Sequence, residues 1–250
     1  MPGSLALAAV AFAPGLAIGS FLNVVAARVP LKRSIVTPGS ACMSCGHEVA
    51  WYDNVPVVSY LVLRGRCRGC GAGIGWVYPA VELLTALLIA ACFLAFGWSG
   101  KSFVAAGFCA VLVTISATDL SHRIVPNVIV LPAAALVLFA QTALEPSAEW
   151  ALAAFGASFF LFLAALAYPK GMGMGDVKLA LLLGAMLGRT VPVALMLGMI
   201  AALVPSVVLF ARHGSAARKM AIPFAPFLAF GSIVALFFGD ALLNAYLSLL

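Results

Sequence analysis

Charged residues are scarce in this sequence of 250 residues: lysine, arginine, aspartate and glutamate together make up 9% of it, against about 25% in ordinary globular domains. Hydrophobic residues make up 64%, and the mean hydropathy is +1.15. Eight acidic and fourteen basic residues are too few to cover the core of a water-soluble protein of this length. The composition therefore excludes a soluble globular protein, and we expect lipid to cover most of the surface.

Two further absences narrow the class of protein. No basic segment precedes the first apolar run, Ser4 to Ala27, which is long enough to span a bilayer, so we interpret it as a retained helix and not as a cleaved secretory signal. No basic stripe interleaved with aromatic residues accompanies the net charge of +6, which argues against nucleic acid as a partner. The basic residues lie at the ends of apolar runs, where membrane topology explains them.

Seven apolar runs have the length of membrane-spanning segments, and the sixth, residues 177–211, is too long for a single helix. Gly188, Arg189 and Pro192 near its middle would break a helix there. Division at this point predicts an all-α polytopic membrane protein with about eight transmembrane helices. The other runs are residues 4–27, 79–98, 102–118, 128–144, 150–168 and 221–248.

The lysines and arginines predict the orientation of these helices, because basic residues collect in short loops on the cytoplasmic side. Eight spans with the amino terminus outside leave only Lys101 and Arg189 on the outer side. We therefore expect both termini outside. The twelve basic residues on the inner side are Arg28, Lys32, Arg33, Arg64, Arg66, Arg68, Arg123, Lys170, Lys178, Arg212, Arg218 and Lys219.

One sizeable polar segment, residues 28–78, interrupts the apolar sequence. It predicts a small cytoplasmic loop domain between a first transmembrane helix, residues 1–27, and a membrane-embedded domain of about seven helices, residues 79–250. The apolar stretch from Val55 to Leu63 contains Pro56 and is too short to span a bilayer. We expect it to form a strand or the small core of the loop domain.

The loop contains two Cys-x-x-Cys pairs, each followed by glycine: Cys42 with Cys45, and Cys67 with Cys70, separated by 21 residues. Each pair can form a tight turn that points two thiolates at one metal ion, and two such turns complete a closed four-thiolate zinc site. We expect two short strands to fill the gap between the pairs. Such a site has no open position for water, so we predict a structural zinc in a zinc-ribbon-like loop that has little core of its own.

The alternative interpretation of these cysteines is a pair of disulfides, or four unrelated thiols. The basic residues place the loop in the reducing cytoplasm, where disulfides are rare, so the metal is favoured. Cys92 and Cys109 lie within spans and are expected to be core thiols.

Four other polar side chains are expected to be structural. His47 follows the first cysteine pair and is interpreted as an exposed neighbour of the metal, not a ligand. Glu82, one turn into the second span, is expected to pair with a base or to hold the loop domain in place. Asp53 and its neighbour Asn54 are expected to form a turn.

Two aspartates stand at the ends of spans on the same side of the membrane. Asp119 closes the third span and Asp176 opens the sixth, and the predicted topology puts both at the cytoplasmic face. Two carboxyl groups that approach closely cannot both ionise: one keeps its proton and donates it to a scissile carbonyl, while the other takes a proton from the attacking water. The sequence therefore predicts the catalytic pair of an aspartic peptidase.

Glycine is concentrated directly before Asp176, at Gly171, Gly173 and Gly175. A backbone without side chains lets an extended peptide approach closely, so we expect a substrate loop here. A phosphate cradle is the weaker alternative, because the Gly-Lys-Ser/Thr ending and the preceding strand are missing. Each aspartate alone is explained equally well as a structural helix-end carboxylate, but the pair and the glycines together favour catalysis.

Together these stretches resemble the bacterial type IV prepilin peptidases, also called leader peptidase and N-methyltransferase enzymes, over nearly the whole chain. The resemblance is carried by Gly19-Ser20-Phe21-Leu22-Asn23-Val24-Val25, by the two cysteine pairs with Trp51 to Pro56 and Leu63 to Cys67, by Tyr78 to Leu84, by Asp119 with Ile124 to Asn127, and by Gly171 to Lys178.

The resemblance implies that Asp119 and Asp176 are catalytic, within a catalytic domain of residues 79–250, and that the four cysteines bind zinc. It implies cleavage of the short basic leaders of pilins, or of the pseudopilins of type II secretion, after glycine at the cytoplasmic face of the bacterial inner membrane. It also implies methylation of the new amino terminus with S-adenosylmethionine, at positions that the sequence does not identify.

Two other classes of function compete with the peptidase. A transporter or channel would use the aspartates as a proton or ion relay, but the sequence shows no repeat between its halves, and both aspartates lie at span ends. A docking module would bind partners through the zinc loop, and the loss of either aspartate would then be harmless.

Overall fold

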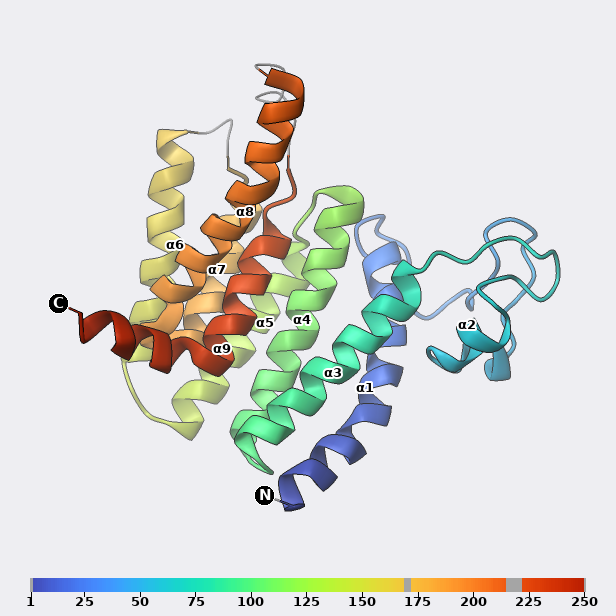
Figure 1. The fold of residues 1–250 in the computed structure, drawn as a ribbon, viewed down its shortest axis with the longest axis horizontal. Coiled ribbons are helices and arrows are strands. Elements are labelled where there is room, and N and C mark those ends of the chain that lie inside the picture. The colour runs from blue at the N-terminus through green and yellow to red at the C-terminus, as the bar shows by residue number, and fades with distance from the viewer. Residues whose placement is uncertain (1, 169–171, 215–221, 250) are drawn as a thin grey trace. The chain divides into compact units, whose positions relative to one another are not determined.

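The structure, a computed structural model, describes residues 2–168, 172–214 and 222–249. Its long elements are all helices, and seven stretches of the described chain are long and apolar enough to cross a membrane (Figure 1). The predicted all-α polytopic membrane protein is therefore confirmed. The long helices are α1 (Pro2–Arg28), α3 (Val77–Phe96), α4 (Gly100–His122), α5 (Asn127–Leu144), α6 (Glu149–Ala167), α7 (Met174–Leu187), α8 (Val191–His213) and α9 (Ala225–Leu247).

The sixth of these stretches, Met174–His213, is broken at the predicted position. Helix α7 ends at Leu187, a short turn η2 (Gly188–Thr190) follows, and α8 begins at Val191. Gly188 adopts φ 54°, a left-handed conformation that favours glycine, and the backbone N–H of Arg189 donates to Oε1 of Glu149 at 2.7 Å. The turn is thereby fixed to the start of α6.

Contacts with neighbouring helices give the directions of α7 and α8 relative to α6 and α9. At one end of α7, Gly188 lies against Glu149, and near the other end the Ser158 hydroxyl donates to the Val177 carbonyl, so α7 is antiparallel to α6. Helix α8 is antiparallel to α9, because Gly198 packs against Leu228 while Thr190 packs against Gly239. Because the sixth of the seven stretches divides into α7 and α8, the described chain has eight long helices, as predicted.

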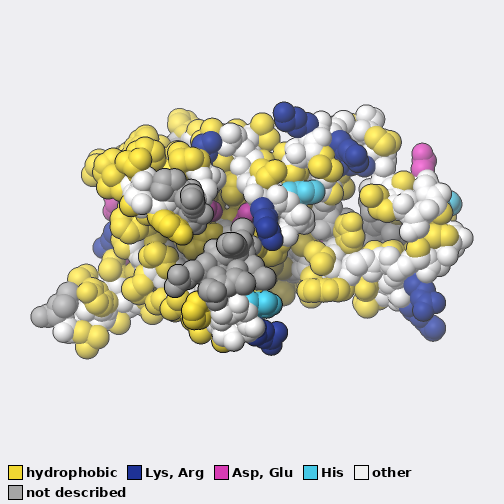
Figure 2. Space-filling view, turned by 90° about the horizontal axis from the view of Figure 1, so that it is seen from above, with side chains coloured by type: hydrophobic (Ala, Val, Ile, Leu, Met, Phe, Trp, Pro, Cys, Tyr) yellow, Lys and Arg dark blue, Asp and Glu magenta, His cyan; other side chains and the backbone are white. Residues whose placement is uncertain are grey.

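The exposed side chains are mostly apolar, as expected for a surface that lipid covers. In the space-filling view, hydrophobic side chains dominate and charged side chains are few and scattered (Figure 2). Large apolar side chains on the helices are more than half exposed, among them Phe155, Phe159, Leu203 and Phe238.

The chain divides into two compact units, Met1–Thr114 and Ile115–Leu250. In the second unit, glycines bring helices into backbone contact: a Cβ atom at Gly184 would overlap the carbonyl oxygen of Ala153, and one at Gly231 would overlap the carbonyl oxygen of Ala194. Small residues at helix contacts are typical of membrane proteins, where close packing replaces the hydrophobic effect as the force between helices.

Replacing Gly231 by alanine is expected to destabilise the protein by about 1–3 kcal/mol, because the added methyl group meets backbone that cannot rotate away. Thermal unfolding of the detergent-purified protein measures the loss as a lower Tm. Gly156→Ala on α6 is the matched control, since a Cβ atom there comes within 4 Å of no described atom outside the nearby backbone of its own helix. Equal Tm values for the two variants would contradict the close packing of α8 and α9.

In the first unit, α1 packs along α3 (Figure 1). A Cβ atom at Gly15 would lie 2.7 Å from Cα of Ala86, and one at Gly19 would lie 2.6 Å from Cα of Glu82, so both glycines permit this close approach. The segment between the two helices holds the cysteine pairs, a 3-10 helix η1 (Trp51–Asn54) and a short helix α2 (Val58–Val62).

The expectation of strands in this loop is wrong. The stretch from Val55 to Leu63 contains the helix α2 (Val58–Val62), and the described loop shows β-bridges only as isolated pairs, Ala41 with Glu48 and Arg66 with Gly73. Pro56 has no N–H to contribute to a strand ladder. The Ser59 hydroxyl donates to the Tyr52 carbonyl at 3.0 Å and accepts from the Val55 N–H at 3.2 Å, which folds the segment back on itself.

Candidate active site and metal centre

Asp119 and Asp176 both lie in the second unit, on different helices. Asp119 stands in the last turn of α4 and is 7% exposed, and its Oδ2 accepts a hydrogen bond from the backbone N–H of Ala225 at 3.0 Å. Asp176 stands in the first turn of α7 and is partly exposed, and its N–H donates to the Gly173 carbonyl at 3.1 Å. The ends of three helices, α4, α7 and α9, therefore meet at this site.

The two carboxyl groups lie within electrostatic reach of each other, since the charge of Asp119 acts on Asp176. Arg123, one turn beyond Asp119, adds a positive charge that acts on Asp119. The structure thus brings together the two aspartates that the sequence singled out. Two carboxyl groups that come close enough can share one proton and serve as acid and base at the same time.

Two of the three glycines before Asp176 lie in the described chain, while Gly171 falls outside the described residues. Gly173 is exposed and extended, and it directly precedes α7. Gly175 lies inside the first turn of α7, where a Cβ atom would be 2.9 Å from Cβ of Val125. The absence of a side chain at 175 lets α7 begin against the segment that follows α4, which helps to bring Asp176 to Asp119.

Two contacts at this site were not foreseen from the sequence. The partner of Asp119 is a backbone N–H at Ala225, 106 residues away, and no residue type there signals the contact. Lys178 on α7 donates to Oδ1 of Asn127 at the start of α5, at 2.9 Å. The sequence shows a lysine and an asparagine near the predicted catalytic residues. Their residue types indicate that each can form a hydrogen bond, but they do not show that Lys178 and Asn127 bond to each other.

The four cysteines of the loop converge in the first unit. Their sulfur atoms all lie within 4.8 Å of one another, and Sγ–Sγ distances are 3.8 Å for Cys42 with Cys70 and 4.0 Å for Cys45 with Cys67. Sulfurs placed 2.3 Å from a central zinc ion in a tetrahedron are about 3.8 Å apart. All four are free thiols, so the arrangement fits a four-thiolate metal ion and not a pair of disulfides.

The backbone explains why each cysteine pair is followed by glycine. Gly46 and Gly71 adopt φ 71° and 73°, and their N–H groups donate to the carbonyls of Cys42 and Cys67, both at 2.9 Å. In addition, backbone N–H groups of Cys45 and then of Ser44 lower the pKa of the Cys42 thiol to about 6. The Ala72 N–H lowers the pKa of Cys70, but hydrogen bonds with the other three thiols outweigh it and raise that pKa to about 11. A lowered pKa favours the thiolate, which is the form that binds metal.

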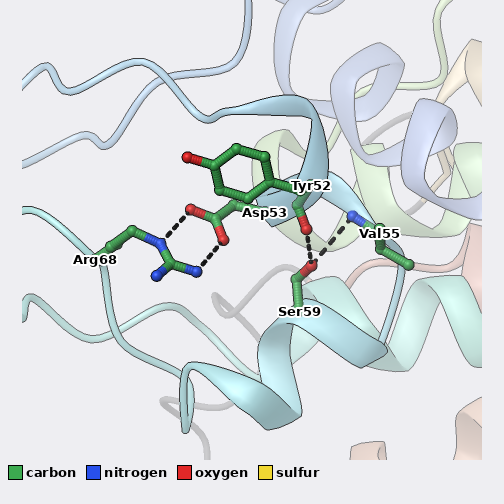
Figure 3. Close-up of polar contacts among 5 residues, drawn as sticks. All are labelled: Tyr52, Asp53, Val55, Ser59 and Arg68. Carbon is green, nitrogen blue, oxygen red and sulfur yellow. Dashed lines mark hydrogen bonds and ion pairs between the residues drawn. The ribbon is translucent and has the colours of Figure 1, made fainter.

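Asp53 joins the turn η1 to the second cysteine pair, as Figure 3 shows. Its carboxylate accepts two hydrogen bonds from Arg68, at 2.7 Å from Nε and 2.6 Å from Nη2. The Arg68 guanidinium holds the pKa of Asp53 below its ordinary value, so the ion pair persists at neutral pH. This pair ties the turn that holds Trp51 and Tyr52 to the cysteine cluster.

Glu82 and His47 also occupy defined places in the first unit. Oε2 of Glu82, on α3, accepts a hydrogen bond from the Val57 N–H at 2.7 Å, which agrees with the expectation that Glu82 holds the loop. His47 is exposed and lies close to Gly69 of the other cysteine turn, outside the set of four sulfurs.

Comparison with known proteins gives two family matches. The Bacterial Peptidase A24 N-terminal domain matches residues 14–96, which include the four cysteines, and the Type IV leader peptidase family matches residues 106–207, which include both aspartates. No solved structure gives a match.

Full-length relatives agree with these matches. The prepilin leader peptidase/N-methyltransferase of Bacillus subtilis is 35% identical over 248 residues, which cover 94% of this chain and 96% of that protein. The protein of the same name from Pseudomonas aeruginosa is 35% identical over 266 residues, covering 93% of this chain and 91% of that protein. That from Aeromonas salmonicida is 32% identical over 270 residues, with the same two coverages.

Proposed function

Because this chain belongs to the type IV leader peptidase family, we propose that it is a membrane aspartic endopeptidase whose catalytic residues are Asp119 and Asp176. Its substrates are type IV prepilins or pseudopilins, whose short basic leaders it removes after glycine on the cytoplasmic face of the bacterial inner membrane. The observation that carries the proposal is that Asp119 and Asp176 stand at the ends of separate helices that Gly175 brings together by packing against Val125.

The aspartate pair supplies both proton transfers that peptide hydrolysis needs. The ionised carboxylate takes a proton from water, whose oxygen forms a bond to the scissile carbonyl carbon. The protonated carboxyl donates to the carbonyl oxygen, so no full negative charge builds up there. When the carbon–nitrogen bond breaks, the leaving amine takes its electron pair and a proton from the pair, and the carboxyl product is left on the leader.

The glycines before α7 provide the surface for the substrate backbone. We propose that Gly173 and Gly175, together with Gly171, form the substrate loop, since the exposed Gly173 lies beside Asp176 and presents no side chain. An extended peptide can then lie against the loop with its scissile carbonyl facing the two carboxyl groups.

We propose that Cys42, Cys45, Cys67 and Cys70 bind one structural zinc ion, in a loop domain of residues 28–78 between the first helix, residues 1–27, and the catalytic domain, residues 79–250. The sulfur spacing supports zinc, and four cysteine ligands leave no place for a reactive water. The zinc would therefore hold the loop together and take no part in the cleavage.

The second proposed activity is N-methylation of the newly exposed amino terminus with S-adenosylmethionine. The lone pair of the amine forms the new nitrogen–carbon bond, while the carbon–sulfur bond breaks and its electrons remain on sulfur. The product ammonium releases one proton. The peptidase step must come first, because it creates the amine.

The test is an assay of a full-length prepilin with the purified protein in liposomes. We expect a gel shift for loss of the leader, and in the presence of S-adenosylmethionine a further mass increase of one methyl group in the product. An intact precursor, with protein that is folded and carries zinc, would refute the peptidase. A cleaved but unmethylated product would refute only the second activity.

A further inference from the structure

A cavity of about 490 Å³ lies in the first unit, between the cysteine loop and the loop-side ends of α1 and α3. Ligand sites for small molecules commonly enclose 300–1,000 Å³, so the cavity can take a molecule of nucleoside size. The aspartate pair plays no part in it, since both aspartates belong to the second unit. Cys42 and Cys67 line one side of it, so the cavity borders the proposed metal site and extends from there toward the helices.

Polar side chains line the cavity where the helices leave the loop. Ser20 and Asn23 come from α1, and Glu82 comes from α3, and the rings of Tyr60 and Tyr78 complete the wall. Asn23 is oriented by a hydrogen bond from its Nδ2 to the Tyr78 carbonyl at 3.1 Å. Polar groups within a membrane helix are costly, so their concentration here indicates a ligand.

The cavity wall contains two carboxylates, Asp53 and Glu82, and two guanidinium groups, Arg68 and Arg28. Arg28 donates its hydrogen bonds to backbone carbonyls of the loop, so it forms no ion pair with Glu82. Asp53 is paired with Arg68 through two hydrogen bonds. Glu82 is 8% exposed and accepts only the backbone N–H of Val57 at its Oε2, and among the described residues no lysine or arginine forms an ion pair with it. A buried carboxylate without a cation favours a positively charged ligand.

The backbone at Val57 is also unusual. Val57 has φ 60° and ψ −48°, and a β-branched residue at positive φ is a steric outlier. The hydrogen bond to Glu82 holds it in this conformation. Strained backbone of this kind concentrates at ligand sites, where the surrounding structure maintains it.

We propose that this cavity binds S-adenosylmethionine, with the Glu82 carboxylate facing the sulfonium cation. The proposal rests on the methylation proposed above, and it assigns that activity a place in the chain. The Glu82 carboxylate would attract the sulfonium of S-adenosylmethionine by its charge, and the tyrosine rings would contact it through cation–π interactions. The polar side chains of Ser20 and Asn23 can bind the ribose hydroxyls.

The test compares S-adenosylmethionine, which is cationic at sulfur, with S-adenosylhomocysteine, which is neutral there, by calorimetric titration of the zinc-loaded protein in detergent. Glu82→Gln keeps an oxygen that accepts the Val57 N–H but removes the charge. We expect its dissociation constant for S-adenosylmethionine to rise about tenfold, while that for S-adenosylhomocysteine changes less than about threefold.

Two further variants complete the design. Glu48→Gln removes a carboxylate from the exposed surface of the same loop, outside the cavity, and is expected to leave both affinities unchanged. Ser20→Phe places a large ring among the side chains that line the cavity and is expected to weaken the binding of both ligands together. Tm and zinc content show whether each variant is folded.

The outcomes separate this proposal from the proposed function. The wild-type protein could methylate the cleaved substrate while Glu82→Gln protein binds S-adenosylmethionine normally. This result would contradict binding in the cavity but leave the methylation activity standing. The same holds if Glu82→Gln weakens both ligands equally or if Ser20→Phe weakens neither. Wild-type protein that neither binds S-adenosylmethionine nor methylates would overturn both.

Discussion

Replacing Asp119 or Asp176 by asparagine is expected to abolish leader cleavage, with a rate at least about 10³-fold below that of the wild type. An amide can neither take the proton from water nor hold the shared proton, so each variant loses half of the acid–base pair. Asparagine is nearly isosteric, and its side-chain oxygen can still accept the Ala225 N–H, so Asp119→Asn is expected to fold. Initial rates of prepilin cleavage in liposomes measure the effect.

The matched control for this experiment is Asp240→Asn. Asp240 lies on α9 in the same unit and pairs with Arg189 at 2.9 Å, with 69% of its side chain exposed. An exposed ion pair contributes little to stability, so this variant is expected to retain the wild-type rate. If either site variant cleaved as fast as Asp240→Asn, the aspartic mechanism would be wrong, and a relay or docking role for the pair would have to be considered.

Replacing Cys67 by serine is expected to reduce the zinc content from about one ion per chain to nearly none, because zinc sites of this type need four thiolates. The loop has short elements and isolated bridges in place of a packed core, so losing the metal should unfold it locally. Elemental analysis measures the metal. Limited proteolysis between residues 29 and 76 measures the opening of the loop.

Cys92→Ala is the control for the cysteine experiment. Cys92 is a buried thiol on α3 whose sulfur lies 3.9 Å from that of Cys109, and both are separate from the loop cluster. This variant is expected to keep its zinc and its resistance to protease. A full zinc complement in Cys67→Ser protein would show that the four cysteines do not form the metal site.

The sequence predicted the membrane helices well because lipid imposes a simple requirement. Each span needs a long apolar run, and a run of 35 residues with Gly188 and Pro192 in it has to turn. The structure places the break between Leu187 and Val191. The loop was predicted less well, since Val55 to Leu63 suits a strand or a helix by composition, and contacts from Ser59 and Glu82 decide between them.

The candidate site also contains residues that the sequence could identify and contacts that it could not. The four cysteines and the two aspartates could be selected from the sequence, because their residue types and spacing carry the chemistry. Contacts that depend on the folded backbone could not be selected, such as the Ala225 N–H that binds Asp119. Glu82 was identified as a residue that holds the loop, but its role in a cavity depends on which residues surround it in space.

The shortness of α7 has a consequence for where hydrolysis takes place. A helix of 14 residues is about 21 Å long, and Asp176 lies only about 18 Å from the turn at Gly188, whereas the hydrocarbon layer is about 30 Å thick. Glu149, Arg189 and Asp240 mark that turn as the end in contact with water. On the proposed aspartic mechanism, the scissile bond then descends below the headgroups of the other leaflet to meet Asp176, and water follows it there. Membrane thickness thus becomes a variable of the reaction, because hydrophobic mismatch sets how far the substrate and water have to travel.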